Sequence, residues 1–493
     1  MYDFGEDERQ VEINIYGAHS TLTGRYPLSI VKDITSYPVE GAEFSKAYRS
    51  GRWDGRTHLF KTRGSSFPTG LVKIVKETLE DLQYTVLVHD HRIPPKIVGP
   101  KSFELEGVKF EYPYDYQLDI CKQMVKAKQG IIKASTNSGK TEIACAVTRY
   151  LGLRTLFIVS TVELMYQGQK RFMKRLGLTE KEVGIVGDGN WSPGSLVTIA
   201  MLHTLESRLD TDECLTLLND AEVLFVDECH HVGSKTWYVV LTLCPAFYRF
   251  ALSGTPLDRG DGANLRLIAA TGEVIVNIEN KFLVDRGVSA RANIIFDKIT
   301  APVLQKKIKY PTAYKQGVVE NEELMNRVLE WVRIFNDKKL NILILCEEIA
   351  HGELLSESLW TKMSPFVPNQ FIHGSEDTET RAKALESFGE RKLPVLVAST
   401  ILDEGVDVST IDVLILTGSK ESTIRTKQRL GRGLRGDKLI VVEFANFCHK
   451  YLLKHSLTRL QDYKKEECFP IHFSGPDKEL VDKIWEEPDV RKW

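Results

Sequence analysis

The sequence predicts an α/β fold with two successive lobes, each built around a parallel sheet, and a small α/β domain before them. From about residue 130, short apolar runs rich in β-branched residues alternate with segments of helical spacing, and this pattern restarts after a break. Apolar runs without polar alternation are typical of strands that are buried on both faces, as in a parallel sheet. The residues before this pattern follow a different one, which indicates a separate domain.

Composition sets broad limits on the function. The chain has 493 residues, enough for about three domains of ordinary size. Lys plus Arg (65) nearly equals Asp plus Glu (67), so the net charge of −2 gives no overall attraction to a polyanion, which would need local basic patches. The chain has no apolar run near the ~18 residues of a membrane span, and its first ten residues lack the features of a signal peptide. We therefore expect a cytosolic protein without a membrane partner.

The eight cysteines never occur as Cys-x-x-Cys, and several lie inside apolar runs. This usage favours buried, reduced thiols over a zinc site or a disulfide framework. Cys229, His230 and His231 are adjacent, but three neighbouring residues of an extended chain cannot all point inward. We therefore expect no metal cage of cysteine and histidine.

The small domain is expected over residues 1–112. The sequence predicts a strand at 11–16, an amphipathic helix at 71–82 and a further strand in TVLVHD at 85–90. The domain is expected to end near the proline-rich loop at 93–100 or at the hairpin-like segment after it.

The first lobe is expected over residues 113–292 and the second over 293–455, followed by a helical tail at 456–493. The apolar runs predicted as parallel strands are 130–135, 155–160, 222–228 and 249–254 in the first lobe, and 341–346, 394–400, 412–419 and 438–444 in the second. The stretch 270–310 is predicted to cross between the lobes in extended segments. After about residue 446, helical spacing predicts a helix that packs back onto a lobe.

A phosphate-binding loop is predicted at ASTNSGKT, residues 134–141, between an apolar run and a helical segment. A loop that enters a helix presents backbone N–H groups and the positive end of the helix dipole to phosphate oxygens. Lys140 would neutralise the β and γ phosphates of a nucleotide, and Thr141 has the hydroxyl that usually binds Mg²⁺. Ala134 stands where the strict pattern has glycine, while SGKT is intact. The predicted nucleotide-binding residues of this loop are Ser135, Thr136, Asn137, Ser138, Gly139, Lys140 and Thr141.

An acidic pair, Asp227 and Glu228, ends the apolar run at 222–228. A carboxylate that emerges from a buried strand near a phosphate loop can hold Mg²⁺ through water, and its neighbour can orient the attacking water. We assign Asp227 to the metal and Glu228 to water activation. Taken alone, such a pair could equally be a solvated strand end.

An arginine-rich segment, QRLGRGLR at 428–435, lies between two predicted strands of the second lobe. A guanidinium group makes bidentate contacts with phosphate oxygens, and one supplied across a cleft can stabilise charge that develops on the γ phosphate. We predict Arg432 and Arg435 as arginine fingers, supported by Gln428 and Arg429. Taken alone, this segment could be a solvated or nucleic-acid-facing surface.

In this order, the phosphate loop, VDECH at 226–230 and the arginine-rich segment resemble the superfamily 2 helicases and translocases. Between about residues 113 and 446, five further segments resemble the Q motif and motifs Ia, III, IVa and V: PYDYQLD (113–119), VSTVELMYQ (159–167), LSGTP (252–256), FIHGS (371–375) and STILDEGVDV (399–408). The resemblance implies two RecA-like lobes with ATP and Mg²⁺ between them.

The same resemblance implies roles for single residues. Gln117 would read the adenine, with Tyr114 or Tyr116 packed on the base. The residues that would couple nucleotide state to nucleic acid are Ser253 and Thr255. The residues that would face the nucleotide from the second lobe are Gly405 and Asp407. The residues that would lie near the DNA strand are Thr161, Gly374 and Thr400.

Further segments, apart from the motifs of the two lobes (here called the motor), resemble UvsW-type phage helicases: 48–60, 67–84, 281–296 and 451–463. Enzymes of this type are ATP-dependent DNA helicases that unwind branched DNA, migrate Holliday junctions and regress forks. The resemblance implies a role in recombination, replication or repair, with branched DNA held through its backbone and without sequence specificity. It also implies a monomer in the cytoplasm, of the host cell if phage-encoded, with a recombinase or single-strand-binding protein as possible partner.

A basic patch in the small domain is the predicted contact with DNA. Residues 40–76 contain eight Lys or Arg and three Asp or Glu, a local charge of +5 in a nearly neutral chain. Basic side chains around a tryptophan suit phosphates together with a stacked base or a junction. The predicted DNA-binding residues here are Arg49, Arg52, Trp53 and Arg56. The alternative is that Trp53 fills the core of the small domain.

Two alternatives to a DNA helicase stay open. One is an RNA helicase or remodeller, because the DECH tetrad does not by itself exclude RNA. The other is an ATP-gated switch that closes on nucleic acid without processive unwinding. The presence of Glu228 and of both finger arginines argues against the switch.

Overall fold

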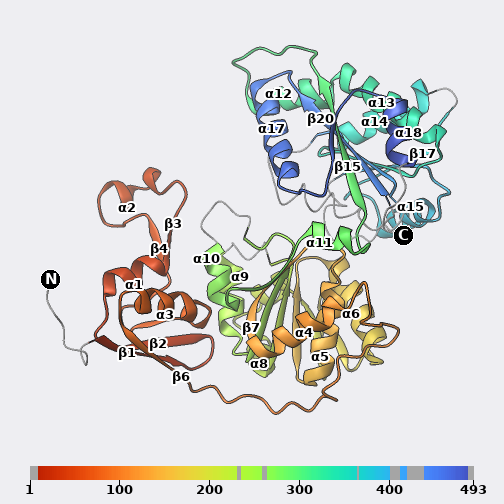
Figure 1. Cartoon of the computed structure of the whole chain (residues 1–493). Helices are drawn as coiled ribbons and strands as arrows, with labels where there is room; N and C mark the ends of the chain where they lie inside the picture. The colour runs from red at the N-terminus through yellow and green to blue at the C-terminus, as the bar shows by residue number, and fades with distance from the viewer. Residues whose placement is uncertain are drawn as a thin grey trace. The chain divides into compact units, whose positions relative to one another are not determined.

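The computed structural model describes residues 9–229, 235–257, 264–363, 366–399, 411–418 and 438–486. It divides into two compact units (Figure 1), the first formed by residues 1–134 and 139–277 and the second by residues 135–138 and 278–493. Within the described ranges, no helix is long and apolar enough to cross a membrane.

The first unit begins with a small sheet covered by helices on one face (Figure 1). Its strand order is β5-β2-β1-β6, and a separate two-stranded sheet pairs β3 with β4. The strands are β1 (Gln10–Ile15), β2 (His19–Gly24), β3 (Ser36–Pro38), β4 (Arg56–His58), β5 (Ser66–Pro68) and β6 (Thr85–Asp90). The helices are α1 (Leu28–Ile34), η2 (Ala42–Phe44), α2 (Lys46–Arg49), η3 (Thr69–Leu71) and α3 (Val72–Asp81). Every second residue of β1 faces inward onto Val75 and Leu79 of α3, which is the alternation expected for a half-buried sheet.

The small sheet domain packs against the first lobe through α10 (Asn264–Thr271). At Gly70 the two backbones approach so closely that a Cβ atom would lie 1.9 Å from the carbonyl oxygen of Ile268. Lys73 Nζ and Glu273 Oε2 form an ion pair of 2.7 Å beside this contact. The small domain and the first lobe therefore form one compact unit.

The first lobe has an eight-stranded sheet in the order β10-β9-β11-β8-β12-β13-β7-β14. Its strands are β7 (Gln129–Ala134), β8 (Thr155–Val159), β9 (Val183–Gly187), β10 (Asn190–Ser192), β11 (Val197–Met201), β12 (Val223–Asp227), β13 (Tyr248–Ser253) and β14 (Val274–Ile278). Its helices are α4 (Tyr116–Ala127), α5 (Lys140–Leu151), α6 (Val162–Leu176), α7 (Leu202–Glu206), α8 (Asp212–Asp220), α9 (Lys235–Leu243) and α10. Both faces are covered: Phe157 of β8 packs on Phe172 of α6, while Leu156 and Ile158 join the core under α8 and α9.

The second unit has a seven-stranded sheet in the order β17-β18-β16-β19-β20-β15-β21, and the neighbouring strands pair in parallel. Its strands are β15 (Arg291–Ile299), β16 (Ile342–Leu345), β17 (Asn369–Ile372), β18 (Val395–Ala398), β19 (Val413–Leu416), β20 (Lys438–Asn446) and β21 (Ile471–Phe473). Its helices are α11 (Asn280–Asp285), α12 (Tyr310–Tyr314), η5 (Lys315–Val319), α13 (Glu322–Asp337), α14 (Ile349–Lys362), α15 (Thr378–Gly389), α17 (Lys450–Lys464) and α18 (Lys478–Glu486).

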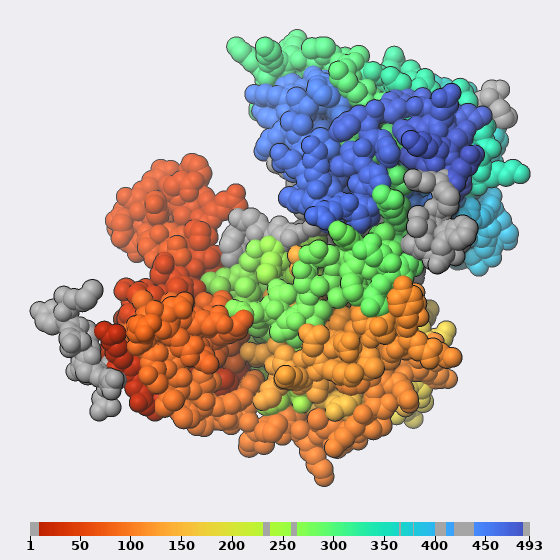
Figure 2. Space-filling model, in the orientation of Figure 1, coloured from red at the N-terminus to blue at the C-terminus, as the bar shows by residue number. Residues whose placement is uncertain are grey.

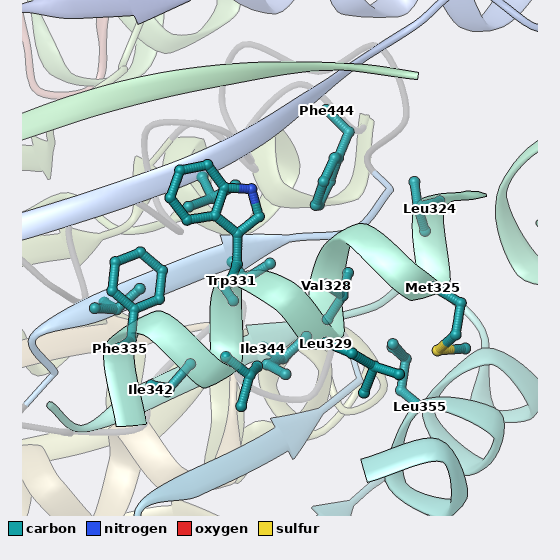
Figure 3. Close-up of a cluster of buried hydrophobic side chains, with 14 of the residues drawn as sticks. Leu324, Met325, Val328, Leu329, Trp331, Phe335, Ile342, Ile344, Leu355 and Phe444 are labelled. Atoms are coloured by element: carbon teal, nitrogen blue, oxygen red, sulfur yellow. The ribbon is translucent and has the colours of Figure 1, made fainter. Parts of the chain in front are cut away.

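The main core of the second unit lies between α13 and the sheet (Figure 3). Apolar residues recur along α13 at helical spacing, so Val328, Trp331 and Phe335 point to the strands. The indole Nε1 of Trp331 donates to Asp297 Oδ2 at 3.0 Å, which satisfies the buried ring nitrogen. Burial raises the pKa of Asp297 to about 6.

The predicted α/β class is confirmed. Every apolar run predicted as a strand contains one, and the predicted helices at 71–82 and after residue 446 are α3 and α17. The segment 270–310 differs from a simple linker, because residues 291–299 form β15 inside the second sheet. The helix α17 runs through residue 456, where the sequence places the start of a tail, and β21 in that tail pairs with β15.

A buried arginine ties β13 to two helices of the first lobe. Arg249 is 2% exposed, and its guanidinium donates to the carbonyl oxygens of Cys244, Leu241 (2.6 Å) and Ala270 (3.0 Å). These acceptors lie at or near the carboxyl ends of α9 and α10, where carbonyl groups lack helical partners and the helix dipole favours a cation.

We expect Arg249→Met to lower the free energy of unfolding of the first unit by ~3 kcal/mol, because three buried carbonyl groups lose a charged donor. The matched control is Arg154→Met, which removes an exposed ion pair with Asp220 worth about 1 kcal/mol or less. Thermal unfolding of the full chain measures both. Equal, small shifts of the transition in the two variants would contradict this role of Arg249.

Candidate nucleotide site

The predicted phosphate loop joins a buried strand to a helix, as the sequence suggests. Strand β7 ends at Ala134 and α5 begins at Lys140. Gly139 precedes the helix with φ 82° and Asn137 has φ 71°, so the chain turns through the left-handed region before α5. Lys140 Nζ donates to the carbonyl oxygen of Ala134 at 3.2 Å, which holds the ammonium group over the loop. The free N–H groups at the start of α5 and this ammonium group fit a phosphate chain.

Gln117 lies against the same loop. It is buried in the first turn of α4, and a Cβ atom on Gly139 would lie 2.2 Å from its Nε2 atom. A side chain larger than hydrogen at Gly139 would therefore displace the glutamine. Tyr116 is 6% exposed and Tyr114 is 41% exposed, so Tyr114 is the aromatic ring with a surface that an adenine base could cover.

The acidic pair lies at the end of β12, whose last residue is Asp227. In the sheet, β13 lies between β12 and β7, so the carboxyl ends of these three parallel strands share one edge with the phosphate loop. Asp227 Oδ1 accepts from the backbone N–H of Glu228 at 3.1 Å, and Glu228 has φ 46°. Glu228 therefore has a strained, left-handed backbone, which bends the chain sharply where β12 ends at the edge of the sheet.

Electrostatics at this edge suit a cation. Burial and the neighbouring Glu228 raise the pKa of Asp227 to about 7, while the Lys140 ammonium group acts in the opposite direction. A divalent cation between the carboxylates and a phosphate chain would offset both causes of the rise. Thr141 is in the first turn of α5, at the position expected for a metal-binding hydroxyl.

Ser253 and Thr255 lie on the neighbouring strand end. Ser253 is the last residue of β13, opposite Lys133 of β7, and both hydroxyl residues are buried. The backbone N–H of Thr255 donates to Ser253 Oγ at 3.1 Å, so the two residues form a local turn beside Asp227. The structure thus brings together the predicted loop, acidic pair and coupling residues at one sheet edge.

The loop also contacts the segment that leads into the second sheet. The N–H of Ser135 donates to the carbonyl oxygen of Ile278 at 3.0 Å, and Asn137 Nδ2 donates to Ser289 Oγ at 3.4 Å. Sequence reasoning did not single out Ser289, which is 152 residues from Asn137, although it lies in the segment 281–296 that resembles UvsW-type helicases.

Several predicted residues lie outside the described residues. These are His230, His231, Thr400, Gly405, Asp407, Gln428, Arg429, Arg432 and Arg435. The strands that lead to them in the second unit, β18 and β19, are described and end at Ala398 and Leu416.

The predicted DNA contacts of the small domain divide into two pairs. Arg56 donates to Ser36 Oγ (2.8 Å) and to the carbonyl oxygen of Ser36 (3.0 Å), and Trp53 Nε1 donates to the carbonyl oxygen of Arg56 (2.7 Å). These contacts join β3 and β4, and Trp53 is half-buried there and not among the described side chains that form the core of the small domain. Arg49 and Arg52 are exposed, and Arg49 Nε donates to the carbonyl oxygen of Glu43 at 2.9 Å.

The two other described residues predicted to grip a strand lie at loop positions. Thr161 is the N-cap of α6, and its hydroxyl accepts from the N–H of Leu164 at 3.3 Å. Gly374 lies in the turn after β17, and a Cβ atom at this residue would have no other atom within 4 Å, so the backbone there is open to approach.

Three family models match the chain. The model "Type III restriction enzyme, res subunit" matches residues 111–258, "Helicase conserved C-terminal domain" matches 323–437, and "DNA helicase UvsW, N-terminal" matches 26–89. These matches fall, in order, on the first lobe, the second lobe and the small domain. The first two matches are those of a helicase with two lobes, and the match of the small domain is to the N-terminal domain of UvsW-type helicases.

Curated relatives of this helicase span most of its length. The ATP-dependent DNA helicase uvsW of Enterobacteria phage T4 is 21% identical over 89% of this chain and 93% of its own. The DNA 3'-5' translocase XPB2 of Sulfurisphaera tokodaii is 25% identical over 72% of this chain and 85% of its own. Among solved structures, S. cerevisiae Dbp5 bound to RNA and ADP BeF3 aligns with a TM-score of 0.52, at 14% identity over 73% of this chain and 89% of that one. This last likeness shows the fold of the two helicase lobes and no more. The predicted RecA-like architecture and helicase class are confirmed.

Proposed function

We propose that this helicase is an ATP-dependent DNA helicase or translocase that acts on branched DNA. The observation that carries the proposal is the shared sheet edge at which the phosphate loop with Lys140 meets Asp227 and Glu228. The two relatives named as a DNA helicase and a DNA translocase support DNA as the substrate.

In this proposal each residue of the edge has one task. The N–H groups at the start of α5 and Lys140 bind the phosphates, and Gln117 with Tyr114 orients the base. Thr141 and Asp227 hold a magnesium ion, which neutralises charge on the phosphates. Glu228 orients the water that attacks the γ phosphate.

The second lobe supplies the remaining groups of the proposal. Arg432 and Arg435 stabilise charge on the γ phosphate, with Gln428 beside them. Gly405 and Asp407 face the nucleotide. In the first lobe, Ser253 and Thr255 couple nucleotide state to DNA from the end of β13, next to the end of β12 with Asp227.

DNA binding is divided among three regions in the proposal. Thr161, Gly374 and Thr400 grip the backbone of one strand, while the small domain, residues 1–112, contacts the junction through Arg49 and Arg52. Such contacts reach sugar and phosphate and carry no base code, so structure and not sequence is recognised. The setting that the phage relative suggests is recombination or repair of DNA in a host cell.

The test compares ATP hydrolysis and strand separation on forked DNA, four-way DNA, linear duplex DNA and RNA of the same sequence. We expect both rates to be highest on the forked and four-way DNA, because a branch offers contacts to the small domain and to the motor together. Highest rates on RNA would favour the alternative RNA helicase. Nucleic-acid binding without strand separation on any substrate would favour the ATP-gated switch.

A further inference from the structure

Two segments of the second unit contain lysine or arginine and lack acidic residues. Residues 298–319 include five lysines and no Asp or Glu. Residues 444–461 include Lys450, Lys454 and Arg459, and again no Asp or Glu. The segments lie more than a hundred residues apart in the sequence, so neither the net charge of −2 nor a local window reveals them as one feature.

The fold places these two segments side by side. Strands β15 and β20 pair in parallel, and their last residues, Ile299 and Asn446, are partners. Beyond the strands, the N–H of Phe447 donates to the carbonyl oxygen of Ile299 (2.8 Å), and that of Leu304 donates to Cys448 (3.0 Å). Helices α12 and α17 lie next to each other at this end of the second unit (Figure 1). In the space-filling view, green atoms near residue 300 adjoin the blue atoms of α17 (Figure 2).

The lysines of this surface are exposed and lack ion-pair partners. Within the described part of the chain, no carboxylate lies within ion-pair distance of the ammonium groups of Lys298, Lys306, Lys307, Lys309 and Lys450. The acidic residues that follow α12 are engaged: Glu320 pairs with Lys315 at 3.2 Å, and Glu323 accepts from the N–H groups of Thr300 and Ala301. We refer to these five unpaired lysines as the lysine surface.

The lysine surface lies at the same sheet edge as the described ends of β18 and β19. All strands of this sheet that pair do so in parallel, so the ends of β15 and β20 share an edge with the ends of β18 and β19. In the sequence, motif V (399–408) comes directly after β18, and the arginine-rich segment 428–435 follows β19. The lysine surface and the two segments that follow β18 and β19 in the chain therefore start from one edge of the sheet.

We propose that the lysine surface binds the sugar-phosphate backbone of a duplex arm of the nucleic-acid substrate, outside the path of the translocated strand. The inference rests on the proposed function and adds a binding surface to it. Five unpaired ammonium groups on one exposed surface create a local positive potential, and a polyanion that binds there releases its own counterions.

The residue types favour backbone contact to duplex over binding of single strands or of base edges. Lysine acts as a flexible point charge on phosphate, whereas base recognition usually needs the rigid fork of arginine or an amide. Single-strand binding relies on free aromatic faces. Here the ammonium groups of Lys298 and Lys450 lie 5.0 and 5.1 Å from the ring centroids of Phe447 and Tyr451. One face of each ring is therefore occupied by a cation and is not free to stack on a base.

The test reverses three exposed charges in the loop before α12, in the variant Lys306→Glu/Lys307→Glu/Lys309→Glu. The control makes the same charge change at the opposite edge of the sheet, with Lys339→Glu/Lys478→Glu/Lys483→Glu. Lys339 precedes β16, and α18 with Lys478 and Lys483 packs near the start of β20, where Lys438 Nζ donates to the carbonyl of Trp485. Thermal unfolding of both full-length variants checks that they fold.

Affinity for forked DNA with long duplex arms is measured over a range of salt concentrations. We expect the loop variant to bind at least about tenfold more weakly at ~0.1 M salt, with the slope of log K against log salt smaller by about 3, because three phosphate contacts are lost. The control variant and the binding of a short single strand should change less than about twofold. Equal weakening in both variants, or none in either, would overturn the proposal and leave the surface to an acidic protein partner.

ATP hydrolysis separates this inference from the proposed function. The loop variant should keep hydrolysis stimulated by a short single strand within about twofold of the parent chain, because the phosphate loop and acidic pair are unchanged. If the parent chain itself shows no nucleic-acid-stimulated hydrolysis, the proposed function fails, while the comparison of affinities still reports on the lysine surface.

Discussion

The Lys140→Ala chain is expected to hydrolyse ATP at least about a hundredfold more slowly than the parent chain, in the presence of DNA. Lys140 is the first residue of α5, and its ammonium group is held over the phosphate loop by the carbonyl oxygen of Ala134. Charge that develops on the phosphates during transfer loses a positioned cation when this side chain is removed, and one such group contributes about 10²–10³ in rate.

The side chain of Lys140 contributes little to folding, because its one described hydrogen bond is to Ala134. The variant should therefore unfold at the same temperature as the parent. Lys126→Ala is the matched control, since Lys126 is an exposed lysine in the last turn of α4. Steady-state rates of ATP hydrolysis are measured for the parent, Lys140→Ala and Lys126→Ala chains with saturating forked DNA. A normal rate in Lys140→Ala would contradict the assigned nucleotide site.

The fold of the motor could be predicted from the sequence because its strands are buried on both faces. Runs such as residues 155–160 and 341–346 have no polar alternation, and the structure places them in the middle of the two sheets. Edge strands gave weaker signals. Strand β21 has three residues and β10 has three, too few for a period to be visible, and both lie at the ends of their sheets.

The site was predictable where chemistry depends on neighbours in the chain. The residues SGKT and the pair Asp227–Glu228 are contiguous, so spacing alone indicates a phosphate loop and an acidic strand end. Contacts between distant segments could not be predicted in this way. Asn137 donates to Ser289, and the segments that follow β15 and β20 are neighbours because these two strands pair.

The basic patch of the small domain shows a further limit. Composition gave residues 40–76 a local charge of +5, but it could not separate exposed cations from those that support the backbone. In the structure Arg56 binds Ser36 and Trp53 binds the carbonyl of Arg56, while Arg49 and Arg52 remain exposed. The hydrogen-bond partners of these side chains therefore could not be predicted from charge alone.

The Arg432→Ala chain is expected to bind ATP almost as well as the parent chain and to hydrolyse it about a thousandfold more slowly. An arginine that approaches the γ phosphate from the second lobe acts mainly on charge in the transition state, so its loss affects the rate far more than ground-state binding. Arg435→Ala should also lower the hydrolysis rate with little change in ATP affinity, but by a smaller factor. Arg391→Ala is the matched control, because this arginine of the same lobe pairs with Asp412, away from the sheet edge that leads to the motifs.

Completion of the nucleotide site by groups from both lobes is the central claim, and one measurement tests it most directly. ATP affinity and DNA-stimulated turnover are determined together for the parent, Arg432→Ala and Arg391→Ala chains. The claim predicts a nearly unchanged affinity with turnover lost in Arg432→Ala alone. Turnover in Arg432→Ala equal to that of the parent chain would contradict it.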